Sequence, residues 1–183
     1  ERINTISEIV RKNKPSKEVI EKAAIKIIEE DVDGLSWRDG YDTDEISRGF
    51  GISEETLQKL SKTVLISSLS TLKFKKYDYD GYQDYFGRIR KFIEKYKIHN
   101  QTIESTEVKK VATETVDYFI NEANPFCATE ISGIFGLSKG PIHEAGYRAV
   151  MDFFSRWETP LRQPYPGLEE IIESYDLHYD ILR

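Results

Sequence analysis

The sequence predicts an all-α protein made of two similar helical lobes. Three observations carry this prediction. A nine-residue block occurs twice, apolar residues recur three and four positions apart along most of the chain, and strand-like alternation is nearly absent outside residues 72–82. The chain has 183 residues, 39% of them hydrophobic, so it can bury a core without a disulfide or a structural metal.

The repeated block reads Glu-Ile-Ser-x-x-Phe-Gly-(Ile/Leu)-Ser and lies at residues 45–53 and 130–138, with six of nine positions identical. The glycine predicts a left-handed turn, which few other residues adopt cheaply. The closing serine, Ser53 or Ser138, is expected to cap the helix that follows. Helix, glycine turn and capped helix together predict a helix-turn-helix in each half.

Two amphipathic helices are expected before each block. The first has the pattern Ile-x-x-Ile-Val at residues 6–10, which returns as Ile-x-x-Phe-Ile at residues 89–93. The second carries an apolar stripe within residues 20–28 in one half and 108–120 in the other. Each half therefore contains two longer helices followed by a helix-turn-helix.

These patterns divide the chain into a first repeat at residues 1–70, a linker at 71–84, a second repeat at 85–156 and an acidic tail at 157–183. The tail predicts one short helix with an apolar face of Leu168, Ile171, Ile172 and Tyr175. We expect this helix to pack against the second repeat. The alternative is that the acidic tail covers a basic stretch and competes with DNA.

Charge and cysteine content limit the class of protein. The net charge is −6, but residues 73–97 hold eight basic and four acidic side chains, the one locally basic stretch. A single cysteine excludes an internal disulfide and favours an intracellular protein, cytoplasmic in a prokaryote or nuclear in a eukaryote. No apolar run approaches the roughly 18 residues of a membrane span, so no membrane contact is expected.

No pattern indicates an enzyme, a cofactor or a metal. The chain lacks a glycine-rich phosphate loop, a nucleophile elbow and paired catalytic carboxylates. Residues 78–84 are rich in aspartate but lack the ligand spacing of a calcium-binding loop. The three histidines are scattered, and Cys127 is expected to be a small buried thiol.

The two blocks give the chain a resemblance to a known family. Tandem helical lobes that each end in Glu-Ile-x-x-x-x-Gly-(Ile/Leu)-Ser resemble the two cyclin-type repeats of the transcription factor B family, over residues 2–155. Residues 85–93 are also similar in style to the opening helix of that family's second repeat. The resemblance implies promoter DNA and a basal transcription partner, such as TATA-binding protein or RNA polymerase. The zinc-ribbon cysteines and the alanine-rich central helix of that family are missing.

Double-stranded DNA would be contacted by the helix after each glycine turn and by the helix that follows the linker. Base reading favours arginine, lysine or glutamine near the start of a recognition helix, and exposed helix-start amides donate hydrogen bonds to a phosphate oxygen. Two carboxylates, Glu54 and Glu55, oppose this in the first repeat. The candidate DNA-binding residues are Ser138, Lys139, His143, Arg148, Gln58, Lys59, Lys62, Arg88, Lys91 and Lys95.

Two functions follow from these patterns. The first is a transcription-associated, non-enzymatic DNA-binding protein, with the tyrosines of residues 77–85 and Phe86 available to stack on bases. The second is a protein-interaction module with cyclin-like lobes and no DNA contact. The alternative for the aromatic residues is a partly buried linker packed between the two lobes. The oligomeric state does not follow from the sequence.

Overall fold

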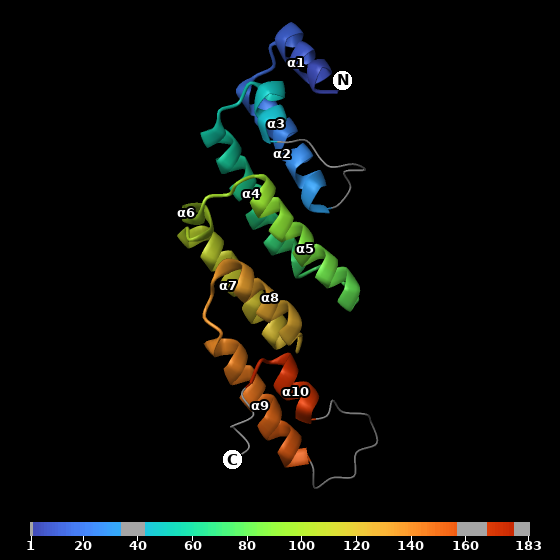
Figure 1. Cartoon of the computed structure of the whole chain (residues 1–183), viewed down its shortest axis with the longest axis vertical. Coiled ribbons are helices and arrows are strands. Elements are labelled where there is room, and N and C mark those ends of the chain that lie inside the picture. Colours follow the sequence, from blue (N-terminus) through green and yellow to red (C-terminus); the bar gives the residue numbers. More distant parts are fainter. Residues whose placement is uncertain (1, 34–42, 157–167, 178–183) are drawn as a thin grey trace. The chain divides into compact units, whose positions relative to one another are not determined.

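The computed structural model describes residues 2–33, 43–156 and 168–177. Within these ranges the chain forms ten helices and no strand, which confirms the all-α class (Figure 1). The helices are α1 (Arg2–Asn13), α2 (Lys17–Asp33), α3 (Thr43–Phe50), α4 (Glu54–Leu72), α5 (Tyr79–Lys95), α6 (Asn100–Ile103), α7 (Thr106–Asn121), α8 (Pro125–Phe135), α9 (Gly140–Arg156) and α10 (Leu168–Ser174). Among these described helices, none combines the length and apolar character needed to cross a membrane.

The chain divides into two compact units, residues 1–111 and residues 112–183. In the first unit α2 packs against α3, α4 and α5, and α1 packs on α3. In the second unit α9 packs against α8 and α10, so the tail helix lies on the second repeat as expected. The division falls within α7 and not in the segment 71–84, so the two-lobe arrangement stays a prediction.

The order of the helices repeats along the chain. By sequence, α1, α2, α3 and α4 correspond to α5, α7, α8 and α9, with the short α6 added in the second series. The backbone also repeats, because Lys14 and Lys97, 83 positions apart, both have a φ of 46° just after their first helix. A non-glycine residue with positive φ is uncommon, so the same departure at equivalent positions supports the repeat.

The glycine turns of the two blocks have the same geometry. Gly51 has a φ of 65° and Gly136 a φ of 56°. After each glycine the next amide donates to a carbonyl five residues earlier, at 3.1 Å for Ile52 and 2.9 Å for Leu137. This bond and the left-handed residue define a Schellman motif. The predicted glycine turn is therefore present in both repeats.

The helices that follow the turns begin differently. Ser53 caps α4, because its Oγ accepts a hydrogen bond from the Thr56 amide at 3.2 Å. In the second repeat the Ser138 Oγ accepts from the Gly140 amide at 3.2 Å, and α9 begins only at that glycine. The serine thus binds a helix-start amide in both repeats, but only Ser53 is positioned as an N-cap.

Candidate functional site

The start of α4 was predicted to read DNA, but its glutamine joins two helices. The half-buried Gln58 donates from Nε2 to the carbonyl oxygens of Tyr96 and Lys97, at 3.0 and 3.2 Å. Its Oε1 accepts a hydrogen bond from the His99 amide at 3.4 Å. These carbonyls follow the last turn of α5, where a helix leaves acceptors without internal partners. Gln58 therefore provides a hydrogen-bond donor for the carbonyl groups at the end of α5.

The two lysines of α4 lie in different environments. Lys62 Nζ is 2.6 Å from Glu107 Oε2, at the start of α7. The hydrogen bond and the charge of Lys62 lower the pKa of the Glu107 carboxyl. Lys59 is exposed. Of the three candidates on α4, one lysine is thus directed to solvent and two side chains hold neighbouring helices.

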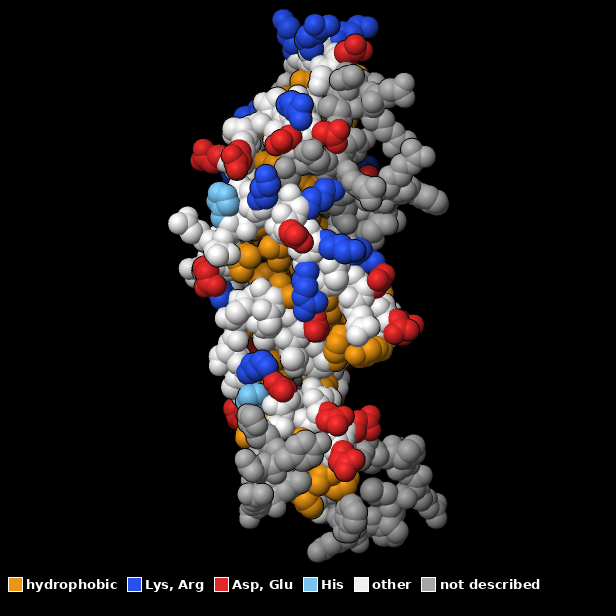
Figure 2. Space-filling view, viewed as in Figure 1, with side chains coloured by type: hydrophobic (Ala, Val, Ile, Leu, Met, Phe, Trp, Pro, Cys, Tyr) orange, Lys and Arg blue, Asp and Glu red, His pale blue; other side chains and the backbone are white. Residues whose placement is uncertain are grey.

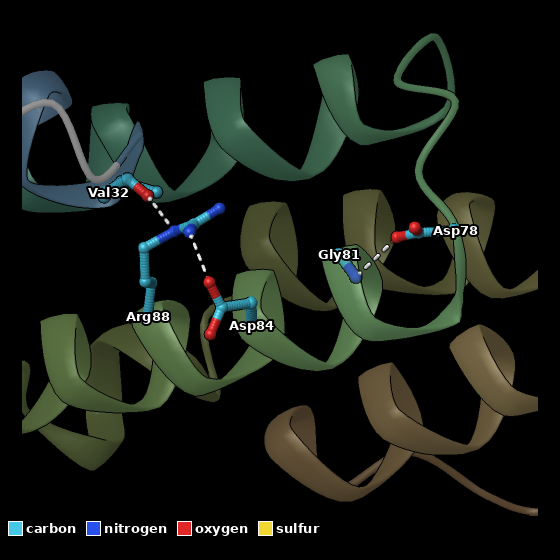
Figure 3. A network of polar contacts seen from close by, with 5 residues as sticks. All are labelled: Val32, Asp78, Gly81, Asp84 and Arg88. Carbon is cyan, nitrogen blue, oxygen red and sulfur yellow. Dashed lines mark hydrogen bonds and ion pairs between the residues drawn. The ribbon is translucent and has the colours of Figure 1, made fainter.

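Arg88 of α5 makes contacts inside the first unit (Figure 3). Its Nε donates to the carbonyl oxygen of Val32 at 3.2 Å, and its Nη1 is 3.2 Å from Asp84 Oδ2. The guanidinium also lies 5.7 Å from the centre of the Tyr85 ring. Val32 belongs to the last turn of α2, the negative end of that helix, where a cation is favourable. Arg88 therefore fastens α2 to α5.

The other cations predicted on α5 share a face with Arg88 by their spacing. Lys91 is exposed, whereas Lys95 is half-buried with its Nζ 5.6 Å from the centre of the Tyr96 ring. A cation over an aromatic ring gains modest electrostatic attraction. On this face Lys91 is the candidate most accessible to an external phosphate.

The candidates on α9 lie beside the tail helix. Lys139 Nζ is 2.5 Å from Asp176 Oδ2, and both side chains are partly exposed. Burial raises the pKa of the Tyr175 phenol, and the charge of the exposed Arg148 partly opposes that shift. Gly146 lets the two helices approach closely, since a Cβ there would lie 2.6 Å from Tyr175 Cβ. The basic end of α9 therefore faces the chain's own tail.

His143 and Ser138 complete the set predicted on α9. His143 is half-buried, and its Nε2 is buried without a hydrogen-bond partner. Ser138 is exposed, with its hydroxyl engaged by the Gly140 amide. The Ser138 hydroxyl can still donate a hydrogen bond to an external acceptor, whereas the His143 Nε2 is buried.

An apolar strip on the outer face of α9 was not predicted from the sequence. Tyr147, Met151 and Phe154 are 44%, 69% and 47% exposed, and their spacing of four and three places them on one side of the helix. On the face shown in Figure 2, apolar and acidic side chains gather over the region of α9 and α10. The signal was a second apolar stripe at helical spacing, next to the inward one. We call these three residues the α9 strip.

The aromatic residues around the linker mostly pack inside the first unit. Tyr85 and Phe86 are at most 1% exposed, and Tyr77 lies edge-on to Tyr82, with ring centres 5.4 Å apart. Tyr79 is the exception, at 58% exposure. Packing therefore accounts for four of these five rings.

The aspartates of residues 78–84 belong to the start of α5. Asp78 Oδ1 accepts from the Gly81 amide at 2.9 Å and caps the helix (Figure 3). The predicted linker therefore ends at this cap, and residues 79–84 are helical. In the described parts of the chain, no three His, Cys, Asp or Glu side chains are grouped to hold a metal ion.

Cys127 has the environment of a structural thiol. It is fully buried in α8, and its amide donates to Asn124 Oδ1 at 3.1 Å. Burial raises the pKa of the Cys127 thiol to about 12, so the reactive thiolate is scarce at neutral pH. This matches the expected small buried thiol.

The chain matches no protein-family model, no curated protein and no solved structure.

Proposed function

We propose that the chain is a non-enzymatic protein-interaction module built from helical repeats, which binds a partner through the α9 strip. The observation that carries this proposal is the exposure of three large apolar side chains on one side of a single helix. Exposed apolar groups of this kind commonly mark interaction surfaces. Tyrosine, methionine and phenylalanine are also among the residues enriched in the centres of protein interfaces.

The environment of the predicted DNA-binding residues supports the same proposal. Gln58, Lys62 and Lys139 each hold another part of the chain. A phosphate or a base would have to displace those contacts. The free energy lost in breaking them offsets the free energy gained from the new contact, so little affinity results. The first turn of α4 also carries exposed Glu54 and Glu55, which repel a phosphate backbone.

Binding to duplex DNA in transcription is the second candidate function. It is favoured by three exposed cations on the predicted elements, Lys59, Lys91 and Arg148. Phosphate contacts by such residues supply much of the affinity of DNA-binding proteins. Under this proposal a basal transcription partner, TATA-binding protein or RNA polymerase, follows only from the resemblance of the helix-turn-helix blocks.

A mobility-shift assay on duplex DNA at low salt separates the two candidates. The test variant changes Lys59, Lys91 and Arg148 to glutamate, and the matched control changes Arg11, Lys12 and Lys26, which are exposed on α1 and α2. We expect no shift, or a weak shift that both variants reduce equally, because general charge attraction does not distinguish the two sets. A salt-dependent shift that only the test variant loses would establish DNA binding and overturn the first proposal.

A further inference from the structure

We infer that α10 is the first helix of a third repeat, and that the α9 strip beside it is the seat of a basic amphipathic helix from a partner protein. This inference rests on the proposed function and adds the chemistry of the partner. It starts from the likeness of α10 to α5. The two helices have equivalent places in the chain, since α5 comes after α4 and α10 comes after α9.

The residues of α10 repeat those of α5 at a spacing of 79. The pattern of residues 89–98 returns at residues 168–177, with aliphatic or aromatic side chains at the same positions. The matched pairs are Ile89 and Leu168, Phe92 and Ile171, Ile93 and Ile172, Glu94 and Glu173, Tyr96 and Tyr175, and Ile98 and Leu177. Three of these six pairs are identical, Ile93 and Ile172, Glu94 and Glu173, and Tyr96 and Tyr175, and all three lie at or just after the end of the helix.

The backbone of the two helix ends is also the same. Asp176 has a φ of 53° and its counterpart Lys97 a φ of 46°. The three amides at the end of α10 donate to the carbonyls of Ile171, Glu173 and Ile172, at 3.1, 3.1 and 2.9 Å. At the end of α5 the corresponding acceptors are Phe92, Glu94 and Ile93, each at 3.0 Å. Both ends therefore form a Schellman motif at the same positions of the pattern.

The positions on α4 and α9 that lie next to these two helices correspond as well. The spacing of 85 between α4 and α9 places Ser61 at the position of Gly146, which touches Tyr175. Ser61 is fully buried, so both positions have a small residue. The spacing also places Glu54 at the position of Lys139. Lys139 pairs with Asp176, and the first repeat carries the opposite charges, glutamate at 54 and lysine at 97.

The first repeat shows what kind of element covers the side of α4 that corresponds to the α9 strip. The positions on α4 that correspond to the α9 strip are Lys62, Ile66 and Leu69. Lys62 meets Glu107 at the start of α7, and Leu69 is 1% exposed, whereas its counterpart Phe154 is 47% exposed. On α4 this side of the helix therefore meets Glu107 of α7 at Lys62 and is buried at Leu69. On α9 the equivalent side chains are exposed, and a helix in the place of α7 would cover them.

The charges around the strip define the partner helix. Glu144 and Asp152 of α9 are exposed, as are all three glutamates of α10; Arg148 and Lys139, which pairs with Asp176, are exposed cations of the same region. An amphipathic helix binds such a surface through its apolar side and gains specificity from opposite charges at the edges. The occupant is therefore a helix with one apolar stripe and basic flanks.

Two labelled synthetic peptides of about 18 residues, five helical turns, provide the test. Both carry leucine at positions i, i+3, i+4 and i+7, and their other positions hold lysine and alanine in one peptide, glutamate and alanine in the other. Fluorescence anisotropy with the full chain should show binding of the lysine peptide and none of the glutamate peptide. Met151→Glu should weaken binding at least about tenfold, as loss of a central contact does. The control, Val19→Glu, changes a single exposed apolar residue of α2, 54% exposed, and should leave binding unchanged.

Met151 is 69% exposed, so its substitution should not disturb folding, and Tyr147→Glu provides a second variant. Equal binding of the lysine peptide to wild type and to both strip variants overturns the inference, as does binding of neither peptide to wild type. The latter result leaves the proposed function standing, since a partner of other chemistry remains open to it. Failure of the proposed function is recognised in a separate experiment, the mobility-shift assay. It would show a DNA shift that is lost only when Lys59, Lys91 and Arg148 are changed to glutamate.

Discussion

The joints that follow the two helix-turn-helix blocks are made in different ways. The first half of α4 uses polar contacts, the hydrogen bonds of Gln58 to the end of α5 and the ion pair of Lys62 with Glu107. The first half of α9 uses close backbone approach at Gly146, and Lys139 just before this helix makes one exposed ion pair. The same motif thus occurs with two kinds of helix contact, and the second is found beside the exposed α9 strip. Three tests by substitution probe this difference.

The largest expected effect is on the joint between α9 and α10. Gly146→Ala would place a Cβ 2.6 Å from Tyr175 Cβ and 2.9 Å from its Cγ, so α10 must shift. We expect the free energy of unfolding to fall by about 1–3 kcal/mol, as for other overpacked sites. Urea denaturation followed by circular dichroism at the helical band measures it.

Gly133→Ala is the matched control for that substitution. Gly133 is an exposed glycine of α8 with no atom within 4 Å of an added Cβ. Alanine is the better helix former, so the control should gain up to about 1 kcal/mol. Equal stability of the two variants would show that α10 does not lie as closely on α9 as the structure has it.

The joint between α4 and α5 should depend on Gln58. Gln58→Ala removes the donor to two carbonyls and the acceptor for one amide, and we expect a loss of about 1–2 kcal/mol of stability. Gln83→Ala, at an exposed position of α5, should change stability by less than about 0.5 kcal/mol. Urea denaturation measures both. A Gln58 variant as stable as the Gln83 variant would show that the hydrogen bonds of Gln58 do not stabilise the contact between α4 and α5.

The smallest effect is expected from exchanging the charges at the tail. Lys139→Glu and Asp176→Lys should each destabilise slightly, and together they should recover stability, since the first repeat already has this order of charges at 54 and 97. The coupling should be about 0.5 kcal/mol at low salt, because the pair is exposed. A double-mutant cycle of thermal unfolding measures the coupling. A coupling of zero would show that the ion pair does not support the correspondence between positions 139 and 54 and between positions 176 and 97.

Most of the fold was predictable because its signals are local. Gly51 and Gly136 follow from the few conformations open to other residues, and the Ser53 cap follows from the unpaired amides of a helix start. The tail helix was predicted from four apolar side chains, and Ile171 and Ile172 are buried as expected. The start of α5 was placed too late because the capping role of Asp78 was not recognised.

The candidate site was less predictable, because it depends on which helices meet. A glutamine and a lysine on a recognition-like helix indicate DNA only if nothing in the protein uses them first. Gln58 donates hydrogen bonds to residues 38 and 39 positions away, and Lys139 donates one to a residue 37 positions away. Helical periodicity describes one helix at a time and contains no information about such partners.

By itself the sequence determined the helical class, the repeated order of helices and the geometry of the glycine turns. These depend on backbone conformations and hydrogen bonds between residues a few positions apart, which residue type controls directly. The tertiary structure alone decided which side of each helix is covered. It set Lys62 against Glu107, placed α10 on Gly146 and left the α9 strip exposed. The reason is that burial is a property of two surfaces, and only folding brings the second one into place.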